Sequence, residues 1–510
     1  MELELKKASI DTYETGGEVA LTQEETAETI VPDYCPDVAR VIESDAAIYL
    51  HSREARDGKA ELSGTVRVTV LYTPEGEGGI RSLEFSIPFH AESGNPLLSG
   101  CQIVAAEAEP EFLETRMLNP RKLFTHCKFI LRLTGYRKAP LSFSTDVEAG
   151  EEARIEKRRE RQHAVLPVRI AERDFTFTDE LSISPGRPGA AELLSTRAAA
   201  VVNETRIIGN KLIVKGIFMF SILYNTEEGE CCSTGGELPF SQIMDVEGAP
   251  EDAIVSLQVQ LTGEDIQIEG GDPDGRQLGV ALYLHAFALI RQEQDLELLT
   301  DLYSTACETR IESAPLEFTA AYDRQVRRQT VREVLETGAV ADSILSLRVD
   351  CGAVSASREG GGTVLRTVAD VRVLYRDEGG VPLVAERRID VSCRVETSEE
   401  IHARAICPEE PQGSVGERGI EVRFPVDFLM EQSGVVKKAG IRAAELDLSA
   451  PRDAAAAPSL ILRCMGREES AWDLAKACNS TIDGILEANR FADEGEIPPE
   501  KLILIPRKRA

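Results

Sequence analysis

The sequence has few of the side chains on which catalysis usually depends. It contains one tryptophan, Trp472, and six histidines, at positions 51, 90, 126, 163, 285 and 402. No histidine lies in a recognisable catalytic motif, and His126 and His285 fall within strand patterns, where a packed histidine is the usual outcome. We therefore expect a non-enzymatic protein with no catalytic, cofactor-binding or metal-ligating residues. One enzyme class stays open, because a glycosidase needs only two carboxylates whose sequence spacing carries no signal.

The cysteines lack the spacing of a metal site or a disulfide framework. Eleven are present, with no Cys-x-x-Cys pair, and they do not recur with the repeats described below. Zinc ligands would cluster, and the disulfides of a repeated domain would repeat with it. Reduced thiols in the protein core, as in a cytosolic protein, are the better interpretation.

Positive charge and long apolar runs are also scarce. The formal net charge is −30, which disfavours nucleic-acid binding and favours partners with basic surfaces. The longest apolar run, Val280 to Ile290, is interrupted by His285 and is too short for a transmembrane segment. The first residues, MELELKKASIDTY, have no apolar core of the signal-peptide type. We expect a soluble cytoplasmic protein.

What the chain does contain is one strand pattern that occurs three times. Residues 64–72 read GTVRVTVLY, residues 216–224 read GIFMFSILY, and residues 367–375 read TVADVRVLY. Apolar residues alternate in each copy, as a half-buried strand requires, and each copy ends in Leu-Tyr. Turn residues and a second strand follow the first two copies, which indicates a hairpin. A later strand also recurs, at 123–136, 278–290 and 420–430.

These repeats predict a mainly β protein with three β-rich units of about 150 residues, at 1–150, 151–308 and 309–449. The third copy is the most divergent, since it lacks the proline found upstream as Pro36 and Pro188. The segment from Asp33 to Ser44 is predicted to be a short helix or turn, with an extended arm as the alternative.

Four polar segments between the predicted strands have simple interpretations. Residues 151–163 and 323–333 are basic, and we expect them to balance neighbouring carboxylates, with a docking stripe for an acidic partner as the alternative. Gly360–Gly362 lacks the Lys-Ser/Thr ending of a phosphate loop and is predicted to be a turn. Asp272–Gly275 resembles a calcium loop but lacks its further carboxylates, so turn chemistry explains it.

The sequence changes character after residue 449. Residues 450–459, APRDAAAAPS, read as a linker. Residues 460–510 then predict a strand, two short helices and a closing strand. Ser470 and Thr481 are expected to cap the helices, and Ile482, Ile485, Leu486 and Asn489 share one helical face.

The terminal segment resembles a LysM domain, which has this βααβ order. The residues that carry the resemblance are Ser470, Trp472, Leu474, Ala475, Ile485, Leu486, Asn489, Pro498, Leu502, Ile505 and Pro506. The repeats, with VPDYCPDVARVI at 31–42, VLY at 70–72 and IPF at 87–89, resemble the SPOCS domain of spore-forming Firmicutes. SPOCS repeats followed by a LysM domain are similar to the SipL-like family of clostridial spore-coat morphogenetic proteins.

The resemblance implies a spore-coat assembly factor without enzymatic activity. In that family the protein lies in the mother-cell cytosol at the forespore surface. There it binds the coat-basement ATPase, stage IV sporulation protein A, largely through its LysM domain. Two other functions remain open: a peptidoglycan or GlcNAc-glycan binder, as most LysM proteins are, and a purely structural repeat protein.

The expected partner- or glycan-binding residues are those at or near the LysM loops. They are Glu468, Glu469, Ser470, Trp472, Asn489, Pro498 and Pro499. Glu468-Glu469 stands where the family usually has Gly-Asp, and Pro498-Pro499 replaces Pro-Gly. Because glycine lets backbone amides approach a sugar closely, these changes disfavour a glycan and favour a protein partner, with neutral drift as the alternative. Residues 459–510 carry eight Lys and Arg against nine Asp and Glu, a mixed surface that suits a protein partner.

Overall fold

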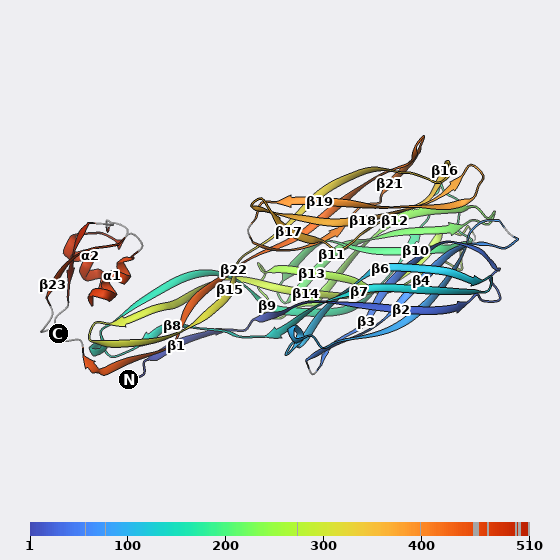
Figure 1. Ribbon diagram of the computed structural model, residues 1–510. Helices are drawn as coiled ribbons and strands as arrows, with labels where there is room; N and C mark the ends of the chain where they lie inside the picture. The colour runs from blue at the N-terminus through green and yellow to red at the C-terminus, as the bar shows by residue number, and fades with distance from the viewer. Residues whose placement is uncertain are drawn as a thin grey trace.

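The computed structural model describes a long β protein with a small helical unit at one end (Figure 1). It describes the whole chain except residues 57, 77, 273, 398, 452–457, 467–468, 495–496, 498–500 and 508–510. Strands make up most of the described chain, so the prediction of a mainly β protein is confirmed. No helix within the described residues is long and apolar enough to cross a membrane.

The first segment pairs its strands within residues 4–148. Two three-stranded antiparallel sheets, β2-β7-β6 and β3-β4-β5, lie beside a separate β1-β8 ribbon. The strands are β1 (Glu4–Ile10), β2 (Tyr13–Ile30), β3 (Val38–Arg56), β4 (Lys59–Pro74), β5 (Arg81–Ser93), β6 (Ile103–Asn119), β7 (Lys122–Lys138) and β8 (Leu141–Glu148), with short 3-10 helices at Pro96–Leu98 and Glu151–Ala153. The sequence predicts a short helix or turn for the segment from Asp33 to Ser44, with an extended arm as the alternative. It forms a turn at 33–35 followed by β3, and the helix is excluded because Val38 already pairs with Pro74.

The second segment repeats this arrangement with longer outer strands. Its sheets are β9-β14-β13 and β10-β11-β12. The strands are β9 (Ile155–Ser182), β10 (Glu192–Ile208), β11 (Lys211–Asn225), β12 (Cys231–Asp245), β13 (Ile254–Ile268) and β14 (Gln277–Ser304). Both β9 and β14 are 28 residues long, about 90 Å of extended chain.

The third segment keeps the same order with two interruptions: the strand equivalent to β10 is divided into β16 and β17, and the strand equivalent to β13 is divided into β20 and β21. Its sheets are β15-β22-β20, with β21 also on β22, and β16-β18-β17, with β19 also on β18. The strands are β15 (Cys307–Leu335), β16 (Ala341–Cys351), β17 (Ser355–Glu359), β18 (Gly362–Asp377), β19 (Pro382–Val395), β20 (Glu400–Ile406), β21 (Gln412–Gly416) and β22 (Gly419–Pro451). Gly360 and Gly361 have φ of 58° and 88° in the turn between β17 and β18, as the turn prediction requires.

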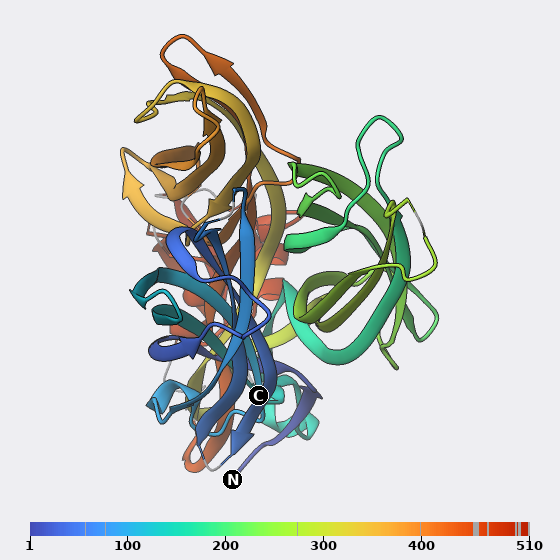
Figure 2. The same ribbon diagram turned by 90° about the vertical axis from the view of Figure 1, so that its right-hand side faces the viewer.

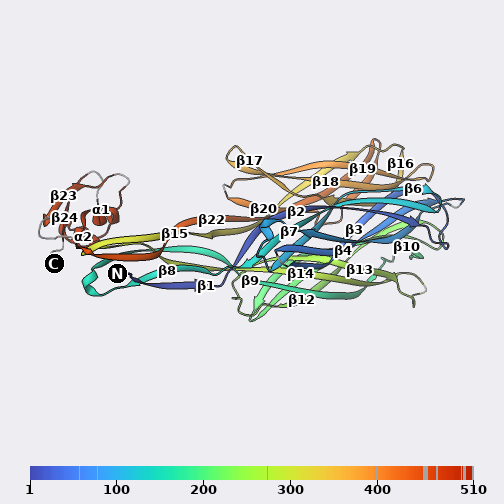
Figure 3. The same cartoon turned by 60° about the horizontal axis from the view of Figure 1, so that its bottom comes forward.

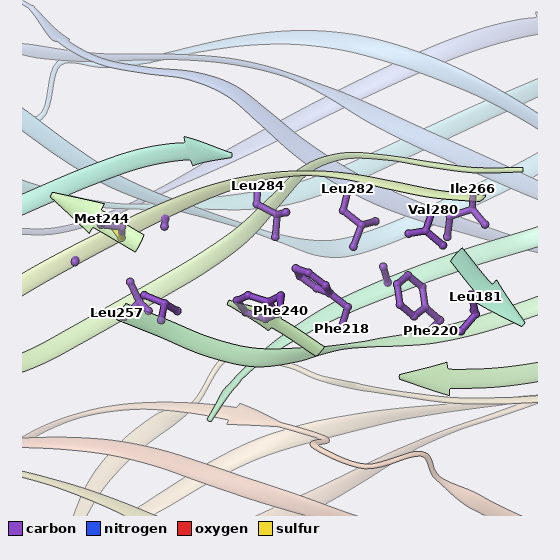
Figure 4. Packing of buried hydrophobic residues seen from close by; sticks show 14 of the residues in the cluster. Leu181, Phe218, Phe220, Phe240, Met244, Leu257, Ile266, Val280, Leu282 and Leu284 are labelled. Atoms are coloured by element: carbon purple, nitrogen blue, oxygen red, sulfur yellow. The ribbon is translucent and has the colours of Figure 1, made fainter. Parts of the chain in front are cut away.

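In each segment the two sheets pack face to face around a separate core. In the second segment Phe218 of β11 packs between Phe177 of β9 and Phe240 of β12, with ring centroids 4.7 and 4.3 Å away. Figure 4 shows Phe218, Phe220 and Phe240 facing Leu282 and Leu284 of β14. The alternating apolar residues found in the sequence thus line the inner faces of the sheets.

We call the two packed sheets of each segment a lobe. The three lobes surround a common axis, as the end view shows (Figure 2). Leu71, Leu223 and Leu374 come from β4, β11 and β18 and pack in one buried cluster between the lobes. The tyrosines that follow them, Tyr72, Tyr224 and Tyr375, are buried instead in the cores of their own lobes. Since successive strand residues point to opposite faces, each Leu-Tyr pair contributes to both kinds of core.

Ion pairs also join the lobes. Arg67 of β4 pairs with Glu264 of β13, between the first and second lobes. Arg197 of β10 pairs with Asp350 of β16, between the second and third lobes. Arg348 of β16 in the third lobe pairs with Asp45 of β3 in the first lobe at 2.7 Å, so each lobe is joined to the other two by an ion pair.

Beyond the lobes, the outer strands continue as three ribbons that form a stalk (Figure 3). The ribbons are β1-β8, the first half of β9 with the end of β14, and the first half of β15 with the end of β22. Buried apolar side chains from all three ribbons meet in the clusters around Leu299 and Leu298. The lobes therefore pack against one another rather than lying apart as separate units.

The limits predicted from the sequence for the three β-rich units, 1–150, 151–308 and 309–449, stay a prediction. Among the described residues of the three segments, strand pairing stays within 4–148, 155–304 and 307–451, apart from a single bridge between Glu2 and Glu445. Pairing alone does not show that each segment folds independently, and the shared stalk and axis clusters join all three.

Candidate functional site

The terminal unit is a two-stranded sheet with two short helices. It consists of β23 (Leu460–Cys464), α1 (Ala471–Cys478), α2 (Ile482–Asn489) and β24 (Leu502–Pro506), and β23 pairs antiparallel with β24. Ser470 caps α1 in a capping box with Asp473, and Thr481 caps α2 through the backbone N–H of Gly484. Hydrogen bonds from Ser470 hold the pKa of Asp473 below its usual range.

Two of the predicted site residues are structural within this unit. The amide of Asn489 joins α2 to β24: its Nδ2 donates to the carbonyls of Ile485 and Leu504, and its Oδ1 accepts from the Leu504 N–H at 2.9 Å. Glu469 accepts from Arg463 at 2.7 Å and from the Gly466 N–H at 3.1 Å. Glu468, Pro498 and Pro499 lie outside the described residues.

Trp472 lies at the contact between the terminal unit and the stalk. Its side chain is 4% exposed and packs edge-on against Tyr303 of β14, with the ring centroids 5.0 Å apart. The indole Nε1 donates to Oδ2 of Asp301 at 2.7 Å. Asp301 also accepts from Nζ of Lys476, at 2.7 and 2.8 Å. A partner can therefore reach the indole only if the unit leaves the stalk.

Further contacts hold the unit in this position. The Tyr303 hydroxyl donates to the carbonyl of Ser480 at 2.7 Å, and the Asn479 side chain donates to the carbonyl of Thr305 at 3.0 Å. Asp301 and Tyr303 are the residues that sequence reasoning missed. They share one face of β14 two residues apart, but nothing in a single sequence links that face to residues 170 positions later.

One surface of the terminal unit is apolar and exposed. Leu460, Leu462 and Leu502 are 50%, 61% and 68% exposed, and they alternate along β23 and β24 with residues that face the helices, such as Ile503 and Ile505. In Figure 1, β23 lies on the side of the unit away from the stalk, while α1 lies nearer to it. This leucine face is thus free of the stalk contact.

The basic junction segments are balanced by neighbouring carboxylates, as the simpler interpretation predicted. Each of six arginines has an acidic neighbour on the same or an adjacent ribbon. The pairs are Arg158–Glu160, Arg159–Asp146, Arg161–Asp295, Arg324–Glu431, Arg328–Asp427 and Arg332–Glu421.

The other groups that the sequence singled out have structural roles. Asp272 accepts from the backbone N–H groups of Asp274, Arg276 and Gln277, which is turn chemistry. His126 and His285 contact Glu24 and Asp174 across neighbouring strands, at 2.6 and 2.7 Å.

All eleven cysteines are free thiols. Burial raises the pKa of Cys127 to about 11 and the pKa of Cys231 and Cys351 to about 12, so these thiols are poor nucleophiles at neutral pH.

Comparison with known families finds one match. The model described as the SipL, SPOCS domain matches residues 37–118 and 189–269. These ranges contain β3 to β6 in the first lobe and the equivalent β10 to β13 in the second. No curated protein matches the chain. The third lobe and the terminal unit lie outside the match, so their assignment as SPOCS and LysM domains stays a prediction. Over the matched residues the first and second lobes are each similar to the SPOCS domain of SipL.

Proposed function

We propose that this protein is a non-enzymatic assembly factor of the spore coat. It acts in the mother-cell cytosol at the forespore surface and binds the coat-basement ATPase, stage IV sporulation protein A, largely through its LysM-like terminal unit. The observation that carries the proposal is the match of two lobes to the SPOCS domain of SipL over the same set of strands. We assign the third segment, 307–451, as a further SPOCS-like lobe, and we call the three lobes, without the stalk, the head.

The architecture supports a scaffold. Three lobes and a stalk bury large apolar clusters, and a cavity near their axis has a volume of about 40 Å³, enough for roughly a water molecule. That cavity is lined by Glu43 and by Arg197, Arg348 and Arg372. The charges of Arg197 and Arg348 join the lobes by pairing with Asp350 and Asp45.

The leucine face supports a protein partner in preference to a glycan. Three leucines that are half exposed or more offer aliphatic surface on a flat two-stranded sheet, and such patches typically mark contacts with proteins. Sugar sites instead need backbone or polar groups in a concave surface. All four described site residues, Glu469, Ser470, Trp472 and Asn489, make internal contacts, so we assign the ATPase contact to the leucine face.

Peptidoglycan or a GlcNAc glycan remains the alternative ligand. It is favoured by the βααβ order of the unit.

The test compares retention of the full chain on the immobilised ATPase and on purified peptidoglycan. We expect retention on the ATPase, lost in Leu462→Glu and Leu502→Glu because a carboxylate in an apolar contact must be desolvated. Ile208→Glu, in the head, is the matched control, since Ile208 is 48% exposed. Retention on peptidoglycan alone would overturn the proposal in favour of the glycan.

Localisation gives a second test. A fluorescent fusion of the full chain should gather at the forespore surface during sporulation, and deletion of residues 456–510 should disperse it. Uniform fluorescence of the full chain would contradict the proposed site of action.

A further inference from the structure

The end of the head opposite the terminal unit carries an exposed apolar group that the proposed function does not use. We call Ile30, Tyr34 and Leu118 the distal tip. Strand β2 runs toward the end of the head far from α1 and α2, and Ile30 is its last residue (Figure 1). Tyr34 lies in the turn that follows, and Leu118 is the extra residue of a bulge at the end of β6. Their exposed fractions are 72%, 88% and 46%.

The turn that presents Tyr34 is held rigidly. The Cys35 N–H donates to the Pro32 carbonyl at 2.9 Å. The guanidinium of Arg121 spans the turn, donating to the carbonyls of Val31 and Cys35 at 2.9 and 2.8 Å. It also donates to the carboxylates of Asp33 and Asp37, both at 3.0 Å. Because the turn is already ordered, it loses little conformational entropy when a partner binds Tyr34.

The second lobe shows that the fold does not need this tyrosine. Its turn has the same backbone hydrogen bond, from the Arg187 N–H to the Ser184 carbonyl at 3.0 Å, and Gly186 occupies the place of Tyr34. A Cβ on Gly186 would meet nothing within 4 Å, and its φ is not positive, so glycine is not required there either.

Ile30 is likewise a feature of the first lobe. It pairs with Lys122, and the residue in the same register of the second lobe is Ser182, which pairs with Gln277. One lobe has thus acquired exposed apolar side chains where its copy has glycine and serine.

The surroundings of the distal tip are acidic. Glu28, Asp33, Asp37 and Glu75 lie on its strand end and turns, against two cations, Arg121 and Lys122. The Asp33 side chain is fully exposed. An acidic rim repels phosphate groups and anionic lipids, and a convex turn offers no groove for a sugar. A tyrosine on a rigid turn is typical instead of protein hot spots.

We propose that the distal tip is a second protein-docking surface, which inserts Tyr34 into an apolar pocket of a partner protein whose rim carries Lys and Arg. Charge complementarity identifies this partner, because the tip has an excess of carboxylates and the whole chain has a net charge of −30. With the terminal unit at the other end, the chain then connects two partners across the length of the head and stalk.

The test places the photoreactive amino acid benzoylphenylalanine at residue 34 of the full chain, in the sporulating cells that make the protein. We expect one main protein adduct, with the crosslinked peptide in an apolar surface rich in Lys and Arg. The matched control carries the same amino acid at Gly186, on the equivalent turn of the second lobe, and should not give this adduct. Equal adducts at both positions, an acidic peptide, a glycan or lipid adduct, or a second copy of this chain would overturn the proposal.

The captured protein is then purified and its affinity measured. Tyr34→Gly, which installs the residue of the second lobe, should weaken binding more than tenfold and leave the thermal midpoint unchanged. Tyr34→Lys should weaken it further through repulsion, while Tyr283→Ser, at another exposed tyrosine, should have no effect. Unchanged affinity in both Tyr34 variants would refute the docking role. Loss of affinity on deleting residues 456–510, with both Tyr34 variants unaffected, would assign the contact to the terminal unit instead.

Discussion

The indole N–H of Trp472 donates to the carboxylate of Asp301 at 2.7 Å, across 171 residues of sequence. The same carboxylate binds Lys476, so one acidic side chain on the stalk holds two residues of α1. This contact decides how accessible the terminal unit is to a partner.

Replacing Asp301 with alanine should loosen the terminal unit from the stalk. Two donors would lose their acceptor in a mostly buried contact, at a cost of about 1–3 kcal/mol. Because Trp472 is the only tryptophan, its fluorescence reports on this site directly. We expect the emission to shift to longer wavelength as water reaches the indole. Asp265→Ala, at an exposed carboxylate on β13, is the control, and an unshifted spectrum in Asp301→Ala would argue against docking in solution.

Replacing Trp472 with alanine should destabilise the terminal unit. Removing a buried aromatic side chain costs about 3–5 kcal/mol, and a unit of this size has little stability to lose. Hydrogen exchange should show lost protection in α1 and β24 with the lobes unchanged, and binding through this unit should fall. A Trp472→Ala chain that keeps its protection and still binds its partner would contradict both a core and a contact role.

Leu223→Ala should weaken the packing between the lobes rather than one lobe. Leu223 is 4% exposed and packs with Leu71 and Leu374 on the common axis. We expect a loss of about 2–5 kcal/mol in the free energy of unfolding, measured with denaturant. Leu71→Ala and Leu374→Ala should cost similar amounts, whereas Leu448→Ala, at a 60% exposed leucine, should cost little. Widely different costs for the three axis leucines would show that the axis is not a shared core.

Acid should weaken the contact between the second and third lobes. Desolvation favours the protonated form of Asp350, but the charges of Arg197 and Arg348 outweigh it and lower its pKa to about 2. A carboxylate with a lowered pKa contributes stability above its usual pKa and loses it as the pH falls through the folded value. The free energy of unfolding should therefore decline between pH about 4 and 2. Asp350→Asn should be less stable at neutral pH and show a smaller decline in this range; a decline equal to that of the unchanged chain would rule out this contribution.

Limited trypsin digestion should cut the chain near Arg154 and in the linker 450–459. Arg154 is exposed, with φ of 41°, in the turn between β8 and β9. Residues 155–165 and 309–332, near the predicted unit limits, should resist cleavage, because they lie in strands paired along their length with β14 and β22. Early cleavage within 309–332, or within 66–72 or 218–224, would contradict this strand pairing.

The sequence by itself determined the strands and their recurrence. Alternation of apolar residues is a local signal, so 64–72, 216–224 and 367–375 identified β4, β11 and β18, the central strands of their sheets. Capping and helical periodicity likewise located α1 and α2, because Ser470 and Thr481 act within one turn of the chain.

Tertiary structure alone decided which surfaces those strands cover. Each of the three copies of the repeated strand ends in Leu-Tyr, but only the packing of three lobes places these tyrosines in separate cores and these leucines on one axis. The same holds for Trp472, whose local pattern fits a core or a contact equally well. Its environment depends on Asp301 and Tyr303, which are distant in sequence, and contacts between distant residues leave no periodic trace in a single chain.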